Sequence, residues 1–200
     1  VFVTKDDGIY AHGIRVLAEA LKEVGDVLVI APDRERTAAG HALTLHKPLR
    51  LEEIEKGYFA ANGTPTDCVN LGINGILKTL PDIVVSGINK GGNLGEDVTY
   101  SGTVSAAVEG TILGVPSIAI SLVADVDYKF EAAASIAVKL TKIILKKGLP
   151  KDTLLNINVP NVTKEEIKGV KITRLGKRIY DRNSIIENID KRGKRYYWIG

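Results

Sequence analysis

The chain has 200 residues, 44% hydrophobic and 26% charged, as is typical of a globular domain with a sizeable core. No apolar run reaches the roughly 18 residues that a spanning helix needs, so we expect no membrane partner. Its single cysteine excludes an internal disulfide. The chain has few aromatic residues and no CxxC pair, and both features disfavour nucleic-acid binding. The net charge of +3 is uneven, because residues 164–195 hold eleven Lys or Arg against five Asp or Glu. A solvated face with subunit contacts explains this excess better than an RNA partner does.

Strand and helix patterns alternate from the start of the chain. An apolar strand at 1–4 precedes a helical pattern at 11–24, and a second buried strand follows at 26–31. This order predicts two parallel strands joined by a right-handed crossover. Two weaker strand patterns at 43–54 and 58–61 predict an antiparallel insertion beside the main sheet.

The alternation continues through the rest of the chain. A helix is predicted to start at Thr64, a capping residue followed by Pro65 and by an acid, Asp67. The later elements are this helix to about 77, strands at 83–85, 117–122, 154–159 and 170–175, and helices at 106–113 and 129–147. The pattern predicts an α/β three-layer sandwich around a mostly parallel sheet.

The expected organisation is one core with a C-terminal extension. Residues 1–175 form the core, which includes the insertion at 43–61, and residues 176–200 begin the extension. The apolar aromatic run at the last residues is typical of a strand interrupted in mid-element, so we expect the natural chain to continue.

The first strand ends in Asp6, Asp7 and Gly8. Two adjacent carboxylates repel one another unless a cation lies beside them, and the glycine lets the backbone turn sharply. Taken alone, this tripeptide suits a solvated turn as well as it suits a divalent-metal site.

Two further oxygen-bearing side chains are expected at the same edge of the sheet. Thr37 lies in the loop after the second strand, and Asn89 follows the strand at 83–85. Because the carboxyl ends of parallel strands share an edge, both groups can converge with Asp6 and Asp7. Two carboxylates, a hydroxyl and an amide oxygen favour Mg²⁺ or Mn²⁺ over zinc. This convergence favours the metal site over the solvated turn.

A glycine-rich stretch follows the same edge. Glycines at 87, 91, 92, 95 and 102 would let backbone N–H groups approach an anion. Ser101, Gly102 and Thr103 then open a helix, whose N-terminus favours phosphate. A metal beside a phosphate cradle predicts phosphoryl chemistry.

Other motifs for related chemistry do not fit the sequence. It contains no GxxxxGK[ST], no GxGxxG in the first turn and no GxSxG elbow. A receiver-type phosphorelay domain would also carry an acidic pair after its first strand, but it would need an aspartate where Asn89 stands.

Eight short motifs together point to a known family. They are DDG at 6–8, APDR at 31–34, GTPTDC at 63–68, SGIN at 86–89, NLG at 93–95, YSGTV at 100–104, NINVP at 156–160 and YWI at 197–199. With these motifs the chain resembles, over essentially its whole length, the SurE (survival protein E) family of metal-dependent 5′-nucleotidases.

The resemblance implies several properties. It implies a Rossmann-like core and one divalent metal ion per subunit, held by Asp6, Asp7, Thr37 and Asn89. It also implies a cytoplasmic homodimer or homotetramer with exchanged C-terminal segments, so that residues 176–200 would begin an oligomerisation extension. Activity on nucleoside monophosphates is implied as well.

The chain departs from the family pattern at three places. Lys5 stands where the family usually has Asn, and this cation would either compete with the metal for the carboxylates or help to hold the phosphate. Thr37-Ala38 occupies the place of the usual Ser-Gly. The threonine keeps the ligand oxygen and adds a methyl group. His12 replaces a proline and is expected in a surface loop. His41, in the loop on the metal side, is not such a departure; a position that supports the metal ligands is open to it, but no functional role is favoured.

The resulting hypothesis is a divalent-metal-dependent phosphomonoesterase that converts nucleoside 5′-monophosphates to nucleoside and phosphate. Asp7 is expected to assist proton transfer, with Asp6 or Asp7 as a covalent nucleophile left open. The residues expected to hold the phosphate oxygens are Asn93, Ser101, Gly102 and Thr103. The alternative is a nucleotide-sensing binding module whose catalysis is weakened or lost because of Lys5.

Overall fold

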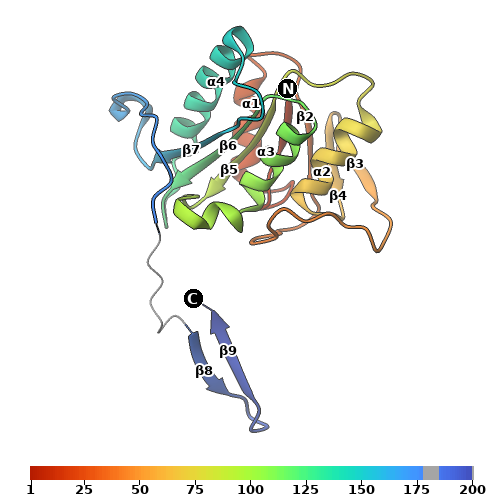
Figure 1. The fold of residues 1–200 in the computed structure, drawn as a ribbon, viewed down its shortest axis with the longest axis vertical. Helices are drawn as coiled ribbons and strands as arrows, with labels where there is room; N and C mark the ends of the chain where they lie inside the picture. The colour runs from red at the N-terminus through yellow and green to blue at the C-terminus, as the bar shows by residue number, and fades with distance from the viewer. Residues whose placement is uncertain (178–184, 200) are drawn as a thin grey trace.

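A seven-stranded sheet forms the centre of the computed structural model, which describes residues 1–177 and 185–199 (Figure 1). The strand order is β3-β4-β2-β1-β5-β6-β7, and every neighbouring pair is parallel except β3 and β4. The strands are β1 (Phe2–Thr4), β2 (Leu28–Pro32), β3 (Leu51–Glu55), β4 (Tyr58–Ala61), β5 (Val84–Lys90), β6 (Ser117–Val123) and β7 (Leu155–Pro160). The predicted, mostly parallel α/β sheet is confirmed.

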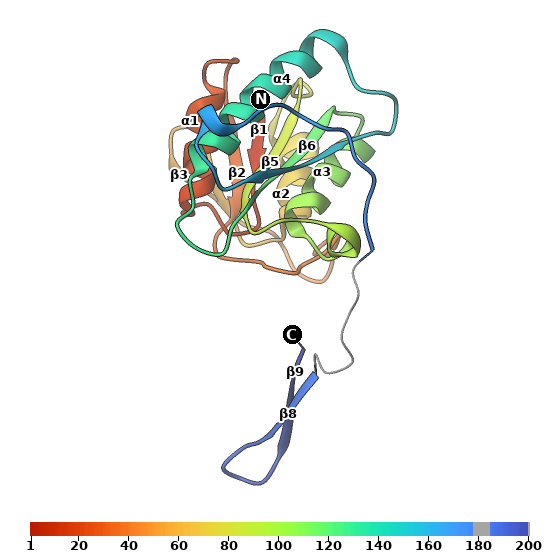
Figure 2. The ribbon, with the colours of Figure 1, turned by 90° about the vertical axis from the view of Figure 1, so that its left-hand side faces the viewer.

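Helices cover both faces of this sheet (Figures 1 and 2). One face carries α1 (His12–Leu21) and α4 (Phe130–Lys147), and the other carries α2 (Pro65–Leu71) and α3 (Gly102–Ile112). The short turns are η1 (Gly72–Ile76), which continues α2, η2 (Gly95–Thr99) and η3 (Lys164–Glu166). Within the described ranges, no helix combines the length and the apolar character needed to cross a membrane.

Strand alternation divides the interior into two main cores. Val3 and Val85 point to the side of α1 and α4, whereas Phe2 and Val84 point to the side of α2 and α3. Because helices cover both faces, the central strands are apolar on both sides, and β1 is completely buried.

The predicted start of α2 is confirmed. Thr64 Oγ1 accepts a hydrogen bond from the backbone N of Asp67 at 3.0 Å, and the Asp67 carboxylate accepts one from the backbone N of Thr64 at 2.8 Å. This reciprocal pair is a capping box, with Pro65 in the first turn. At α3, Ser101 Oγ accepts from the backbone N of Val104 at 3.1 Å and caps the helix.

Two strand predictions need correction. The strand expected at 43–54 begins only at Leu51, because residues before it are drawn away from the sheet: Thr44 donates from its N and Oγ1 to Asp67 at 2.8 and 2.6 Å. The strand expected at 170–175 was wrong. The segment is irregular there and Ile172 is fully exposed, since no described strand lies beside it to complete the pairing.

The C-terminal hairpin is a separate two-stranded antiparallel sheet. It consists of β8 (Ile185–Ile189) and β9 (Arg195–Ile199), with Ile186 opposite Trp198. In Figures 1 and 2 it stands away from the seven-stranded sheet. Its exposed apolar side chains are Ile185, Ile186, Ile189, Tyr196, Tyr197, Trp198 and Ile199.

We predict that Gly13→Ala destabilises the protein by about 1–3 kcal/mol, because the added methyl group overpacks a tight contact. A Cβ at Gly13 would lie 2.5 Å from the carbonyl oxygen of Ile88, and backbone of β5 cannot move aside easily. Chemical denaturation with urea measures the effect. Gly25→Ala is the matched control, because nothing lies within 4 Å of its Cβ position. Equal midpoints for the two variants would contradict this account of the packing of α1.

Candidate functional site

The acid pair follows the central strand directly. β1 lies between β2 and β5, and the chain leaves this strand through Lys5 into Asp6 and Asp7. Strand order reverses between β1 and β5, and ligands of doubly wound sheets bind at such a switch point. Gly8, at φ +90°, brings the turn against the β2 loop, where a Cβ would lie 3.0 Å from the carbonyl carbon of Arg34.

Asp6 is held by the start of α3. Asp6 is 4% exposed, and Thr103 Oγ1 donates a hydrogen bond to its Oδ1 at 2.5 Å. A Cβ on Gly102 would lie 2.8 Å from Asp6 Cβ, so the glycine permits this close approach. Burial raises the pKa of Asp6, while the cation of Lys5 and the hydrogen bond from Thr103 act in the opposite direction.

Lys5 supplies a cation to the same group. The residue is 0% exposed, and its ammonium donates to and forms an ion pair with Asp7 Oδ2. Burial lowers the pKa of Lys5, while Asp7 and Asp6 act in the opposite direction. The carboxylates therefore have different environments: Asp6 faces a helix terminus and a hydroxyl, and Asp7, half-buried, faces an ammonium.

The loop after β2 reaches the acid pair through its backbone. Arg36 N donates to the carbonyl oxygen of Asp6 at 2.8 Å, so the next residue, Thr37, is fastened close to the end of β1. Thr37 is exposed, and its hydroxyl donates to Glu35 Oε1. The conformation of the loop, and not burial of the side chain, therefore determines the position of Thr37.

Asn89 approaches from β5. It was expected to follow that strand, but it lies within it, because β5 extends to Lys90. Thr4 and Ser86 are register partners, so the end of β5 that carries Asn89 follows the same edge as the end of β1, with an irregularity between Ser86 and Asn89. Asn89 Nδ2 donates to the carbonyl oxygen of Gly91 at 3.1 Å, which leaves the amide oxygen as the atom suited to a cation.

These donors fit a hard divalent cation by their chemistry. Among the residues that the structure describes, no three His, Cys, Asp or Glu side chains form a group able to hold a metal. The candidate site therefore depends on two carboxylates supported by neutral oxygens, the ligand type that Mg²⁺ and Mn²⁺ prefer. Thr103 engages one oxygen of Asp6 and Lys5 one oxygen of Asp7, so each carboxylate retains a second oxygen.

The side chains predicted to hold phosphate have other partners within the protein. Ser101 caps α3, and the Thr103 hydroxyl donates to Asp6. Asn93 Nδ2 donates to Ser121 Oγ at 2.7 Å. The backbone N–H groups of Gly102 and Thr103 belong to the first turn of α3, where helix geometry provides no internal acceptor. The start of this helix therefore offers main-chain donors to an anion beside Asp6.

An asparagine network that sequence reasoning did not identify supports this edge of the sheet. The backbone of Asn93 donates to Asn158 Oδ1 at 2.8 Å and accepts from Asn156 and Asn158 at 2.8 and 3.0 Å. These contacts fasten the loop after β5 to β7. The signal was the alternation of asparagines at 156 and 158, which places both on one face of the strand.

A second unpredicted cluster anchors the loop that carries Thr37. Glu109, buried on α3, contacts His41 Nε2 at 2.8 Å and accepts from Asn70 Nδ2 at 2.8 Å. Gly40 N also donates to the carbonyl oxygen of Tyr100 at 3.2 Å. His41 therefore has a structural partner. His12, expected in a surface loop, is instead the exposed first residue of α1, where its ring packs edge-on to Phe130.

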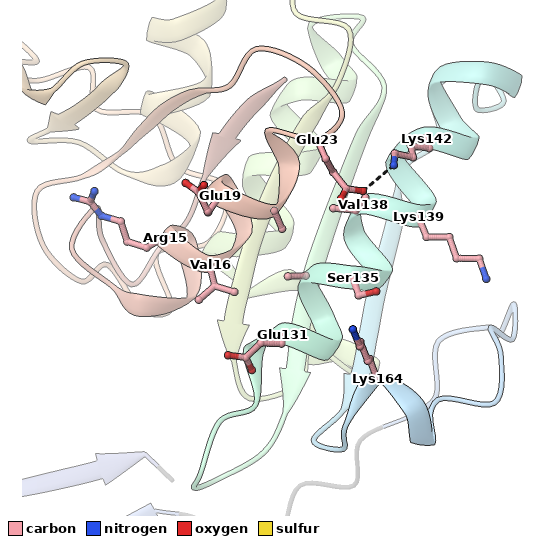
Figure 3. Close-up of a pocket in the computed structure, with 12 residues that line it drawn as sticks. Arg15, Val16, Glu19, Glu23, Glu131, Ser135, Val138, Lys139, Lys142 and Lys164 are labelled. Carbon is pink, nitrogen blue, oxygen red and sulfur yellow. Dashed lines mark hydrogen bonds and ion pairs between the residues drawn. The ribbon is translucent and has the colours of Figure 1, made fainter.

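A large groove lies elsewhere, between α1 and α4 (Figure 3). It measures about 860 Å³, with Val16 and Val138 among its apolar lining residues and a rim where Lys142 Nζ donates to Glu23 at 2.7 Å. Its charged residues have both signs, and none of the candidate metal or phosphate residues lines it. The candidate site at the acid pair is therefore separate from this groove.

The fold and the site define a doubly wound α/β protein with an acidic pair at the switch point of its sheet. A model of the family described as "Survival protein SurE" matches residues 1–182. The chain belongs to the SurE family.

Similar proteins agree with this assignment. The "5′-nucleotidase SurE" of Geobacter sulfurreducens is 58% identical, over all of this chain and 76% of that protein. The protein of the same name from Geotalea uraniireducens is 56% identical, over all of this chain and 81% of that protein. The crystal structure of the SurE protein from Aquifex aeolicus has a TM-score of 0.90 and 49% identity, covering this whole chain and 81% of that one.

We predict that Thr103→Val lowers the free energy of unfolding by about 1.5–3 kcal/mol at neutral pH, as expected for a lost hydrogen bond to a charged group. Because Thr103 is one of the groups that lower the pKa of Asp6, its loss also raises that pKa further. The deficit should shrink as the pH falls through the raised pKa of Asp6 in the folded protein, which lies above the ordinary pKa of Asp, because the hydrogen bond mainly stabilises the charged carboxylate. Denaturation at several pH values measures it.

The conservative variant Thr103→Ser keeps the hydroxyl and should retain most of the stability. A deficit in Thr103→Ser as large as that in Thr103→Val would mean that the hydroxyl does not account for the stability, and would contradict the role of the hydrogen bond.

Proposed function

We propose that this chain is a 5′-nucleotidase that hydrolyses nucleoside 5′-monophosphates to nucleoside and phosphate, with one Mg²⁺ or Mn²⁺ ion per subunit. The observation that carries the proposal is the acid pair beside the N-terminus of α3, which combines anionic metal ligands with main-chain donors for a phosphate. The names of the Geobacter and Geotalea relatives support the same activity.

The residues that would hold the ion are Asp6, Asp7, Thr37 and Asn89. When bound there, a divalent metal would polarise a P–O bond and lower the pKa of a water molecule. Asp6 is kept in position by Thr103, and the loop of Thr37 is kept in position by the Arg36–Asp6 backbone hydrogen bond.

The phosphate would lie at the start of α3. Gly102 and Thr103 would donate their backbone N–H groups, and the Ser101 hydroxyl can donate its proton while its oxygen accepts from Val104. Asn93 would act at the same edge, with its side chain oriented by Ser121. Asp7 is our candidate for accepting a proton from the attacking water, because Lys5 engages only one of its two oxygens among the described contacts.

The experiment is phosphate release from AMP and GMP by the full chain, with Mg²⁺, with Mn²⁺ and with excess EDTA. Activity should require the metal, and Asp7→Asn should lower kcat/KM by on the order of 10²-fold or more. Asp82→Asn is the matched control, because this exposed carboxylate lies before β5 at the opposite edge of the sheet. Full activity in EDTA, or in Asp7→Asn, would exclude the proposed mechanism.

The same assay separates the proposal from a nucleotide-sensing module. Such a module would show a higher unfolding temperature with AMP or GMP but no phosphate release at any metal concentration. Turnover by the wild-type chain excludes it.

We also propose that the chain is a homodimer or homotetramer, in which residues 176–200 exchange between subunits. The described part of this segment supports the idea, because β8 and β9 expose a continuous set of apolar side chains. A second copy carries the same surface, so a symmetric exchange would cover both hairpins.

We predict that Ile186→Asp combined with Trp198→Asp converts the oligomer to a monomer, because both charges fall on one face of the hairpin. Light scattering coupled to gel filtration measures the mass of the full chain. Ile172→Asp, a change of an exposed isoleucine outside the hairpin, should leave the mass unchanged. A monomeric wild type, or an oligomer that survives the double change, would contradict the exchange.

A further inference from the structure

Lys5 is the least expected residue of the site, because an ammonium group is rarely buried completely. Its residue exposure is 0%, and its partner is Asp7 Oδ2. Removing a charge from water costs several kcal/mol unless an opposite charge compensates it. The acid pair provides that compensation, since Asp7 contacts the ammonium and the charge of Asp6 lies close enough to stabilise it.

Lys5 and a divalent ion need the same carboxylate. Two carboxylates and one ammonium leave a net charge of −1 at the site, whereas the acid pair alone would carry −2. An ion bound to Asp7 would also be repelled by the ammonium that already contacts this side chain. The exposed ammonium of Lys90 adds to the positive potential around Lys5.

We propose that Lys5 is an internal counter-ion that competes with the divalent metal for Asp7 and thereby lowers the metal affinity of the site. This inference rests on the proposed metal-dependent function. Lys5 is a positioning residue in this scheme, since it acts on Asp7 and not on the substrate.

The burial of Lys5 favours this role over phosphate binding. A phosphate ligand must be reachable from the substrate side, and the Lys5 side chain has no exposed surface. Its ammonium is directed at the carboxylate that precedes the turn at Gly8. To reach a phosphate, the side chain would first have to leave Asp7.

Competition makes a prediction that simple structural support does not. Without metal, removing the ammonium leaves Asp7 without its partner and should destabilise the fold. With metal, the same change removes a competitor, and a ligand that binds only the folded state stabilises it in proportion to its affinity. Loss of Lys5 should therefore have opposite effects on metal-free stability and on metal-induced stabilisation.

The experiment uses the full chain and Mn²⁺ as the probe. Isothermal titration calorimetry should show at least a tenfold lower Kd for Lys5→Asn and for Lys5→Met, and the second variant retains the aliphatic packing of the side chain. Both variants should unfold at a lower temperature than the wild type in EDTA, and should gain more from saturating Mn²⁺. Lys5→Arg keeps the charge and should keep the wild-type Kd within about threefold. Lys90→Asn controls for removal of a nearby exposed lysine and should change the Kd less than threefold.

The outcomes separate this inference from the proposed function. An unchanged or higher Kd in both Lys5→Asn and Lys5→Met, with binding abolished in Asp7→Asn, overturns the counter-ion role and leaves the metal-dependent function intact. Hydrolysis of AMP in EDTA, with no Mn²⁺ binding by any variant, overturns both. Detectable Mn²⁺ binding only after Lys5 is removed supports the competition in its strongest form.

Discussion

The site depends on one electrostatic constraint, the repulsion between two adjacent carboxylates. Both follow the end of a completely buried strand. Such a pair is unfavourable in a low-dielectric interior unless cations or hydrogen-bond donors compensate it. The chain provides Thr103 and the N-terminus of α3 for Asp6, and the Lys5 ammonium for Asp7. Glycine at 102 makes the first contact possible, since any larger residue would meet the Asp6 side chain.

The loops around this pair are irregular, but side-chain hydrogen bonds hold them in place. Asp67 is an example, because it closes the capping box of α2 and also binds Thr44 of the segment before β3. Glu109 contacts His41 and so holds the loop that carries it, and Asn93 joins the loop after β5 to β7. Buried polar groups of this kind are costly when unpaired, so a network that satisfies them also determines the loop conformation. Residues that bind or react can then lie on loops without losing a defined position.

Much of the fold was predictable because the apolar residues recur clearly at helical spacing in the helices and form clear apolar runs in the strands. The helix start at Thr64 followed from capping chemistry, which is local and needs no tertiary information. The strand predicted at 170–175 failed for the opposite reason: an apolar alternation becomes a strand only where a neighbour completes its hydrogen bonds, and none lies there in the described chain. For the site, the sequence indicated which polar groups follow which strands. It did not show that Thr103 and Asn93 would direct their side chains to Asp6 and Ser121.

The sequence by itself determined the order of strands and helices, the position of the acid pair at the end of the first strand, and the family to which the chain belongs. These features depend on residue type and spacing along the chain, which local physical rules can interpret. Only the tertiary structure decided which groups compensate each carboxylate. Asp6 and Thr103 are 97 residues apart in sequence, and their contact exists because α3 packs against β5 and β6, next to the end of β1. The sequence placed the Lys5 cation beside the acid pair, but only the structure shows that its ammonium is completely buried and pairs with Asp7.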